Sequence, residues 1–408
     1  MNVAGAGRLA ASLRAAGAES PSLCYQCQRC SSGCPTAAAM SIPPARMMRL
    51  AQLGLEERLL GDASIWRCLG CDSCTAHCPY EVSARQLVEL LRQKAMQEHL
   101  AGRQEGFQAD PQLAKGIQAL GLLGGRVRQF RNVSGEDNTA RLAWTSNLAR
   151  QPAGLDRQAG AETLYFVGCV SAMFPMSYAI PQSFVSLLQK AALSFTTLGS
   201  AEWCCGFPLM MAGQLAQARE LMAHNLQEVR ALGARRLVLT CPSCYHMWMH
   251  VYPVQLGEQL GFEVLTASQL VRDLAAGGAL SFGEPKRPGV VTYHDPCDLG
   301  RKGGQYEEPR ELLAKVPGFQ FVEMENSREH ALCCGGGGDL ETFSPELTAE
   351  VAARRVAQAA AVQASYLVSA CPQCVRTLTK AARARELRIR VLDLVQFVDA
   401  AAQAASAG

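Results

Sequence analysis

Ten of the eighteen cysteines in this 408-residue chain fall into two copies of one pattern. In each copy a lone cysteine is followed by an adjacent Cys-Cys-Gly and then by a Cys-Pro-x-Cys. The first copy contains Cys169, Cys204, Cys205, Cys241 and Cys244, and the second contains Cys297, Cys333, Cys334, Cys371 and Cys374. The copies are about 129 residues apart, and a fixed period of this kind indicates a duplicated unit.

Each copy holds one thiolate more than a common metal site uses, since zinc sites and cubane clusters take four ligands. The adjacent cysteines of each pair are badly placed for an ordinary disulfide, because neighbouring Cα atoms are only about 3.8 Å apart. The pattern therefore predicts that five thiolates converge in each copy. In the alternative interpretation, four cysteines hold one metal and the fifth is a buried packing residue.

The other eight cysteines form two runs, each closed by Cys-Pro. Their spacing, Cys-x2-Cys-x2-Cys-x3-Cys-Pro, is that of bacterial ferredoxins, in which the fourth cysteine ligates the other cluster. We therefore expect one 4Fe–4S cluster on Cys24, Cys27, Cys30 and Cys78, and a second on Cys68, Cys71, Cys74 and Cys34. A pair of zinc knuckles is the alternative. His77 is expected to support a ligand or to lie at the surface.

Composition and charge narrow the classes of function. The net charge of +3 gives no strong field that would attract nucleic acid or an anionic membrane. The first twenty residues lack the apolar core of a signal peptide, and no apolar run is long enough for a transmembrane helix. We therefore expect a reducing cytoplasm, in which thiolates bind metal rather than form disulfides.

Strands and helices alternate through residues 161–408, which is typical of α/β units with parallel strands. Strands are expected at 163–167, 194–198, 236–240, 290–293, 319–324 and 366–369, and helices at 180–193, from 215 onward, at 309–316 and at 345–362. Every cysteine group then follows a strand, at the sheet edge where ligands gather. The predicted fold is two such domains, 161–285 and 286–408, after a helical ferredoxin-type domain.

That helical domain is expected to span residues 1–100. Two short helices should pack the clusters away from water with Met47, Leu50, Leu53 and Leu55 and with Leu87, Leu90 and Leu91. Residues 101–160 are expected to form a connector, with one helix through Leu113, Ile117, Leu120 and Leu123 and the rest lying over the surface.

Several segments resemble a known family. The stretches WCCGFPL, LTCPSCYHMW, YHDPCDLGRKGG and ALCCGGGGDL resemble the CCG domain of the heterodisulfide reductase B subunit. Residues 24–78 resemble the C subunit of the same enzyme, so the chain is similar to a fusion of the C and B subunits. The resemblance implies a noncubane 4Fe–4S cluster on each five-cysteine set, with a substrate disulfide cleaved between the two clusters.

Cleavage of a disulfide needs protons, and His294 and His246 lie near cluster cysteines in the sequence, so they are candidate catalytic residues together with Arg301, which follows Cys297. For each histidine a structural role is an equal alternative. Arg301 and Lys302 could bind an anionic substrate or offset cluster charge, or form a solvated surface pair. Asp298 stands where the family pattern usually has histidine. This departure concerns proton delivery or substrate contact at this position, and it does not concern cluster binding.

Electrons would arrive from a partner, because the chain has no dinucleotide-binding fingerprint and we expect no flavin or nicotinamide on it. The resemblance implies a flavin- and iron–sulfur-containing A-type subunit, with a hydrogenase, dehydrogenase or reductase module as other partners. Two alternatives remain. The chain could be a pure electron-relay subunit, as in class II benzoyl-CoA reductase complexes, or a zinc-bearing scaffold in which only the N-terminal clusters are redox-active.

Overall fold

The computed structural model describes residues 11, 12, 15, 21–103, 111–148, 151–284 and 287–404. The chain divides into two compact units, which are described separately. Unit 1 comprises residues 1–125, 208–215 and 329–354, and unit 2 comprises 126–207, 216–328 and 355–408. Two segments from the C-terminal half, one after Cys205 and one containing Cys333 and Cys334, thus fold with the N-terminal region.

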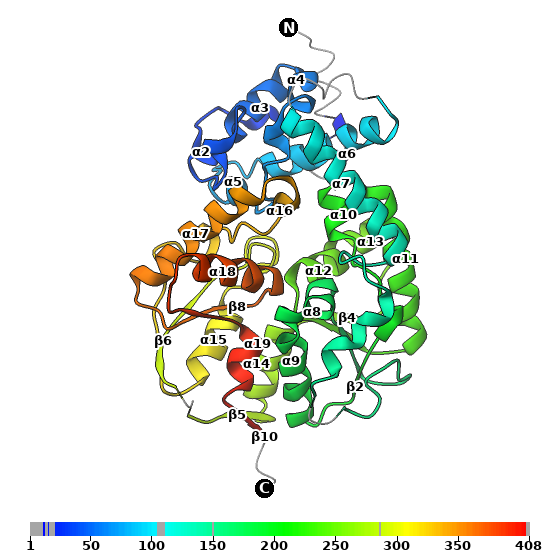
Figure 1. Ribbon diagram of the computed structural model, residues 1–408, viewed down its shortest axis with the longest axis vertical. Helices are drawn as coiled ribbons and strands as arrows, with labels where there is room; N and C mark the ends of the chain where they lie inside the picture. Colours follow the sequence, from blue (N-terminus) through cyan, green and yellow to red (C-terminus); the bar gives the residue numbers. More distant parts are fainter. Residues whose placement is uncertain are drawn as a thin grey trace. The chain divides into compact units, whose positions relative to one another are not determined.

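Unit 1 is helical, and its described part contains no β-strand. Its helices are α2 (Arg29–Ser32), α3 (Pro44–Gln52), α4 (Glu56–Leu60), α5 (Ser73–Ala76), α6 (Ala84–Leu100) and α16 (Leu340–Phe343), with the first parts of α7 (Pro111–Phe130) and α17 (Pro345–Ala361). Phe343 of α16, far away in sequence, packs in one apolar cluster with residues of α6, and Figure 1 shows α16 among the N-terminal helices. The helical N-terminal region is therefore confirmed.

The apolar residues of α3 and α6 form the core of unit 1. Met47, Leu50, Leu87 and Leu91 are buried as predicted, while Leu53, Leu55 and Leu90 are only half-buried. Leu113, Ile117 and Leu120 of α7 join the same cluster. This core surrounds the loops that carry the ferredoxin-like cysteines.

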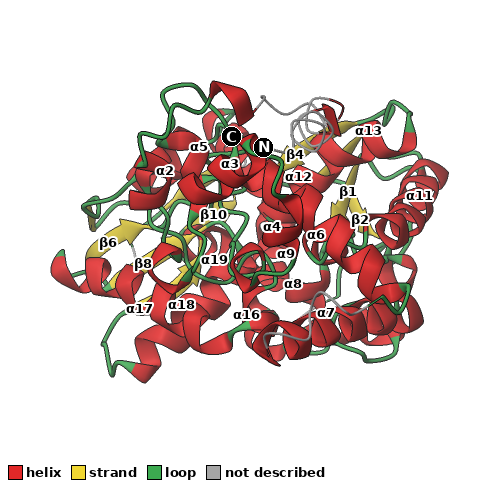
Figure 2. Ribbon diagram, turned by 90° about the horizontal axis from the view of Figure 1, so that it is seen from above, coloured by secondary structure: helices red, strands yellow, loops and turns green. Residues whose placement is uncertain are grey.

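Unit 2 contains two four-stranded parallel sheets built to the same plan. The first has the order β2-β1-β3-β4 and the second β7-β6-β8-β9. The strands are β1 (Thr163–Phe166), β2 (Phe195–Thr197), β3 (Arg236–Leu239), β4 (Glu263–Thr266), β6 (Gly289–Tyr293), β7 (Phe319–Phe321), β8 (Tyr366–Ser369) and β9 (Arg390–Asp393). Figure 2 shows the two groups of strands apart, each with its own helices. The predicted α/β fold and its duplication are confirmed.

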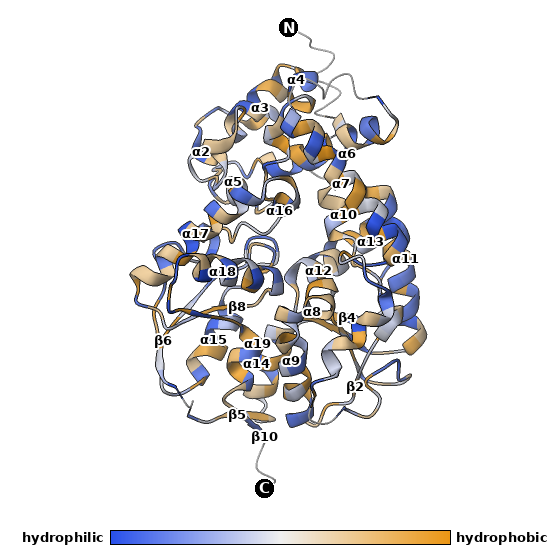
Figure 3. Ribbon diagram, in the orientation of Figure 1, coloured by the Kyte–Doolittle hydropathy of each residue, from blue (hydrophilic) through white to orange (hydrophobic). Residues whose placement is uncertain are grey.

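Helices connect and cover these strands. They are α8 (Cys169–Met173), α9 (Ala179–Lys190), α11 (Leu215–Leu232), α12 (Pro242–His246), α13 (Tyr252–Leu256), α14 (Ala267–Ala276), α15 (Glu307–Lys315), α18 (Pro372–Ala384) and α19 (Leu394–Asp399). Helix α10 (Phe207–Met211) belongs to unit 1 except for its first residue. Figure 3 shows apolar and polar residues mixed along α9 and α11. The apolar residues Ile180, Phe184 and Leu187 of α9 are buried.

The outer strands β4 and β9 were not predicted. Each completes its sheet by pairing in parallel with β3 or β8. Thr266 and Asp393 end these strands and cap α14 and α19 through capping boxes. An antiparallel pair, β5 (Leu280–Phe282) with β10 (Ala402–Ala404), joins the end of the first domain to the end of the chain.

Residues 101–160 contain the expected helix, and most of the described residues after it are exposed or half-buried, but a few are buried. Helix α7 is 20 residues long, and the part that follows it is packed into unit 2. Asn132, Arg141 and Trp144 are all at most 2% exposed. Residues 104–110, 149 and 150 lie outside the described residues. The segment is therefore a structural part of unit 2, and it delivers a charged side chain to a cysteine.

Candidate metal centres

The ferredoxin-like cysteines of unit 1 line two separate hollows. One hollow is lined by Cys24, Cys27, Cys30 and Cys78. The other is lined by Cys34, Cys68, Cys71 and Cys74. In each case the fourth cysteine comes from the other run. The structure thus groups these cysteines as the ferredoxin spacing predicts.

The two loops owe this geometry to left-handed backbone at matching positions. Gln26 and Gln28 have φ of 63° and 66°, and Gly70 and Asp72 have φ of 62° and 60°. These are the second and fourth residues after Cys24 and Cys68. Such turns reverse the backbone within a few residues, so that three thiols of a run face one hollow.

The donor set of these hollows fits a metal cluster. Burial raises the pKa of the Cys30 thiol to about 11 and that of the Cys34 thiol to about 12. A bound metal supplies the positive charge that such buried sulfurs need to lose their protons. Met40, Met47 and Val88 add an apolar lining to the second hollow.

The five cysteines of the first copy all lie in unit 2 and are all buried. Their sulfurs form a continuous series of contacts, from Cys169 to Cys204, Cys205, Cys244 and Cys241 in turn. A Cβ on Gly168, whose φ is +78°, would lie 3.3 Å from the sulfur of Cys244. The structure therefore brings the whole first set together.

The strands deliver these sulfurs. Cys169 begins α8 after β1, and Cys241 caps α12 after β3. Pro242 stands at the first position of α12, where its missing N–H costs no intrahelical hydrogen bond. In the second copy the amide of Cys374 donates to the sulfur of Cys371, at 3.4 Å.

The second set is divided between the units. Cys297, Cys371 and Cys374 belong to unit 2, and Cys333 and Cys334 belong to unit 1. The amides of Gly335 and Gly336 donate to the sulfurs of Cys333 and Cys334, at 3.5 and 3.4 Å. Each part alone shows sulfur atoms held by backbone N–H donors.

The candidate catalytic residues of unit 2 have different environments. His294 is buried, and its Nδ1 accepts a hydrogen bond from Nε of Arg355 at 3.0 Å. His246 is half-buried, with its ring centroid 5.3 Å from that of His250. Arg301 is half-buried. His77, in unit 1, lies 2.8 Å from the carbonyl of Ser73 through Nδ1, consistent with a supporting role.

Asp298 and Lys302 form a buried ion pair rather than part of a solvated surface. Their Nζ to Oδ1 distance is 2.7 Å, and the side chains are 7% and 3% exposed. Ser243, between Cys241 and Cys244, donates to the same carboxylate. Burial would raise the pKa of Asp298, but Lys302 and His246 hold it below its usual range. The carboxylate of Asp298, the residue directly after Cys297, is therefore hydrogen-bonded to the Cys-Pro-Ser-Cys segment of the first cysteine set.

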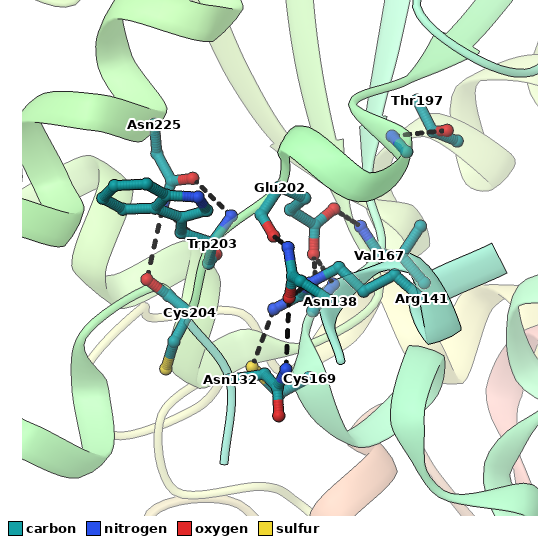
Figure 4. A network of polar contacts seen from close by, with 12 residues as sticks. Asn132, Asn138, Arg141, Val167, Cys169, Thr197, Glu202, Trp203, Cys204 and Asn225 are labelled. Carbon is teal, nitrogen blue, oxygen red and sulfur yellow. Dashed lines mark hydrogen bonds and ion pairs between the residues drawn. The ribbon is translucent and has the colours of Figure 1, made fainter. Parts of the chain in front are cut away.

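A second charged network, drawn in Figure 4, was not predicted. Arg141 donates from Nη2 to the sulfur of Cys169 at 3.1 Å and from Nη1 to Glu202 at 2.6 Å. Asn138 accepts from Nε of Arg141 at 3.0 Å. The one signal in the sequence was Glu202, an isolated charge two residues before Cys204.

A third buried cation lies in unit 1. The guanidinium of Arg92 donates to four backbone carbonyls, those of Ile65, Cys68, Met211 and Gly338, at 2.6–3.1 Å. Its carbon also lies 5.4 Å from the centroid of the Trp66 ring. Arg92 thus ties the Cys68 loop to the two segments that unit 1 takes from the C-terminal half.

Gly338, the last residue of the run Gly335–Gly338, allows its backbone to lie against the backbone of Cys68. A Cβ on Gly338, whose φ is +62°, would lie 2.5 Å from the carbonyl oxygen of Cys68. Gly338→Ala is therefore expected to destabilise unit 1 by about 3 kcal/mol, from left-handed strain and a backbone clash. Thermal unfolding followed by circular dichroism measures the loss.

Gly102 is the matched control, because its φ is +74° and a Cβ would meet nothing within 4 Å. Gly102→Ala should show only the backbone strain, about 1 kcal/mol. Equal losses in the two variants would contradict the steric role assigned to Gly338.

Two domain families match this chain. The cysteine-rich domain family matches residues 163–248 and 291–379, and the 4Fe-4S dicluster domain family matches residues 23–82. The chain is 32% identical over 402 residues to the D subunit of the dihydromethanophenazine:CoB--CoM heterodisulfide reductase of Methanosarcina acetivorans, covering 92% of each chain. The D subunit of the Methanosarcina barkeri enzyme is 30% identical with the same coverage.

This chain belongs to the family of heterodisulfide reductase D subunits. A more distant relative is the EtfAB:quinone oxidoreductase of Syntrophomonas wolfei, which is 27% identical over 83% of this chain and 47% of that protein. As a member of the heterodisulfide reductase family, the chain is an iron–sulfur oxidoreductase subunit with a role in electron transfer. None of its described helices combines the length and the apolar character that crossing a membrane requires.

Proposed function

We propose that this chain is the disulfide-reducing subunit of a redox complex. It takes electrons from a flavoprotein partner and uses two of them to cleave a heterodisulfide-type substrate. The observation that carries the proposal is the contact among the five buried sulfurs of the first cysteine set. A sulfur-rich centre of this size is more than a structural zinc site needs.

The placement of the cysteines supports the following ligand sets. Two cubane clusters would occupy the hollows on Cys24, Cys27, Cys30 and Cys78 and on Cys34, Cys68, Cys71 and Cys74. Two noncubane clusters would be held by Cys169, Cys204, Cys205, Cys241 and Cys244 and by Cys297, Cys333, Cys334, Cys371 and Cys374. When bound, 4Fe–4S clusters supply one-electron transfer. Thiol ligation of this kind also favours a reducing compartment such as the cytoplasm.

Cleavage of the disulfide consumes two electrons and two protons and releases two thiols. His294 can hold one of these protons at a defined atom. Because the guanidinium of Arg355 can only donate, Nδ1 of His294 must accept. A neutral His294 therefore carries its proton on Nε2. His246 is the second candidate, beside Asp298, and Arg301 is a candidate for contact with an anionic substrate.

The names of the relatives bear on the substrate. The two Methanosarcina relatives are named for the CoB–CoM heterodisulfide and for dihydromethanophenazine. We therefore propose a mixed disulfide of two small anionic thiols as the substrate class. The named electron donor of those relatives differs from the flavoprotein that we expect, so the donor must be tested separately from the acceptor.

Iron, acid-labile sulfide and zinc per chain, measured after strictly anaerobic purification, test the proposal. Four clusters of four irons predict about 16 iron atoms and no zinc. About 8 iron atoms with one or two zinc atoms would refute the noncubane pair and favour the zinc-bearing scaffold.

A second assay distinguishes a disulfide-reducing subunit from a pure electron-relay subunit. The loaded chain is supplied with a chemically reduced viologen and a mixed disulfide of two anionic thiols, and thiol release is measured. Two thiols per two electrons are expected. Full iron content without thiol release would instead favour the pure electron-relay subunit.

A further inference from the structure

The segment of residues 131–145 reaches the first cysteine set, although it lies between the parts of the chain that the two domain families match. It belongs to unit 2, as that set does. The amide of Cys204 donates to the carbonyl of Arg131 at 2.8 Å, and the amide of Val133 donates to the sulfur of Cys169. The segment therefore contacts both the lone cysteine and the adjacent pair of this set.

The same segment brings a guanidinium to the sulfur of Cys169. Nη2 of Arg141 donates to this sulfur at 3.1 Å, and the side chain is only 2% exposed. Nη1 and Nε donate to Glu202 and Asn138, at 2.6 and 3.0 Å. Asn138 is fixed in turn, because its Nδ2 donates to the carbonyls of Ser200 and Glu202. Each nitrogen of the guanidinium thus has an acceptor that holds it beside the sulfur.

The counter-ion of Arg141 shares its charge with the backbone. Glu202 accepts from Arg141 and also from the amides of Val167 and Gly168, both at 2.8 Å. Figure 4 shows the guanidinium between the carboxylate of Glu202 and Cys169. The ion pair therefore presents its positive member to the sulfur, and its burial limits screening by salt.

We propose that the segment 131–145 is a built-in part of the first cysteine centre, in which Arg141 is a positioning residue that raises the reduction potential of the bound cluster. Hydrogen bonds and positive charge at a ligand sulfur stabilise the more negative, reduced form of a centre. The centre should thus accept an electron more readily than the same five cysteines would without Arg141. This inference rests on the proposed iron–sulfur occupancy of the first set.

Potentiometric titration of the full-length, iron-loaded chain, followed by electron paramagnetic resonance, tests the inference. Arg141→Gln removes the charge and should lower one midpoint, with a change of about tenfold in the one-electron equilibrium constant, or about 59 mV. Glu202→Gln leaves the cation without its counter-ion and should raise the same midpoint. The pair of Asp298 and Lys302 is the same in both variants, so it does not alter the direction of either shift.

Two control variants separate the contact with sulfur from charge alone. Arg141→Lys keeps the buried charge and should retain most of the effect of Arg141 on that midpoint. Arg128→Gln removes the same charge from an exposed position of α7 and should leave every midpoint unchanged, because salt screens exposed charges. Iron content and circular dichroism of each variant show whether the clusters and the fold persist.

Opposite shifts of one midpoint would support the inference. It is overturned by an iron-replete Arg141→Gln variant whose midpoints match those of the unaltered protein, or by a Glu202→Gln variant whose midpoint falls or stays the same. A merely structural role of the pair does not predict shifts of opposite sign. If Arg141→Gln does not hold its iron, the shift in Glu202→Gln decides the question.

Failure of the proposed function looks different. Low iron in the unaltered protein would refute the cluster assignment and this inference together. Shifted midpoints without thiol release would support the role of Arg141 and contradict only the reductase proposal.

Discussion

Arg92→Met is expected to destabilise unit 1 by about 3 kcal/mol or more. The side chain is 1% exposed, and its loss would leave the carbonyls of Ile65, Cys68, Met211 and Gly338 without this donor. A buried polar group left without a partner costs about 1–3 kcal/mol. Methionine has similar length and no polar atoms that need hydrogen bonds, so the variant isolates the missing donors.

The loss of stability should be confined to unit 1, because the four carbonyls come from segments of that unit. Hydrogen–deuterium exchange measures it as faster exchange of the amides in α6 and in residues 65–70, with much smaller change in the strands of unit 2. Iron content should fall as well, because the Cys68 loop loses its anchor to α6.

Arg46→Met is the control for Arg92→Met. Arg46 lies on α3 of the same unit, is exposed, and makes one hydrogen bond, to the carbonyl of Ser41 at 3.3 Å. Its replacement should change stability by no more than about 0.5 kcal/mol. Equal effects of the two substitutions would mean that the carbonyl contacts of Arg92 contribute nothing to stability.

The regular parts of this protein were predictable because their signals are local. The parallel strands 163–167 and 366–369 are short apolar runs, and the spacing of the cysteines in the two copies agrees to within one residue at each gap. The grouping of Cys34 with Cys68 also follows from spacing, because the ferredoxin pattern fixes which cysteine crosses to the other loop.

The charged residues that support the cysteines were not predictable in the same way. Arg92 occupies an ordinary polar position of a helical pattern, and only the tertiary fold brings four carbonyls to it. Arg141 lies in a segment without periodicity that was expected to lie at the surface. Both positions depend on contacts between residues more than 20 apart in sequence, which a single sequence does not reveal. Strands β4 and β9 were missed because their outer residues are partly exposed.

Asp393→Asn is expected to remove a strong pH dependence from unit 2. The carboxyl of Asp393 is 1% exposed and lies at a small hollow that Thr240, Ala370 and Leu299 also line. Its Oδ1 accepts from the amide of Val395, and burial raises the pKa of Asp393 to about 8. The neutral form is therefore the one that the fold accommodates.

The direction in which stability changes with pH follows from the number of protons that the folded and unfolded states bind. An unfolded aspartate has a pKa of about 3.9, so between about pH 4 and pH 8 the folded state holds more protons than the unfolded state. Stability should then fall as pH rises, by up to about 1.4 kcal/mol per pH unit in this window, and level off above the folded pKa. Asparagine remains a good helix cap and carries no charge, so Asp393→Asn should be the more stable protein at pH 8.

Thermal unfolding of both proteins at several pH values from 5 to 8.5 measures the difference. Asp137→Asn is the control, because Asp137 also caps a helical turn in unit 2 but is solvated, and hydrogen bonds from Thr139 lower its pKa. In that variant the pH profile between 5 and 8.5 should match the unaltered protein. If Asp393→Asn also leaves the profile unchanged, the carboxyl is already ionised in the folded state, and the hollow beside it must hold groups or water that stabilise the charge.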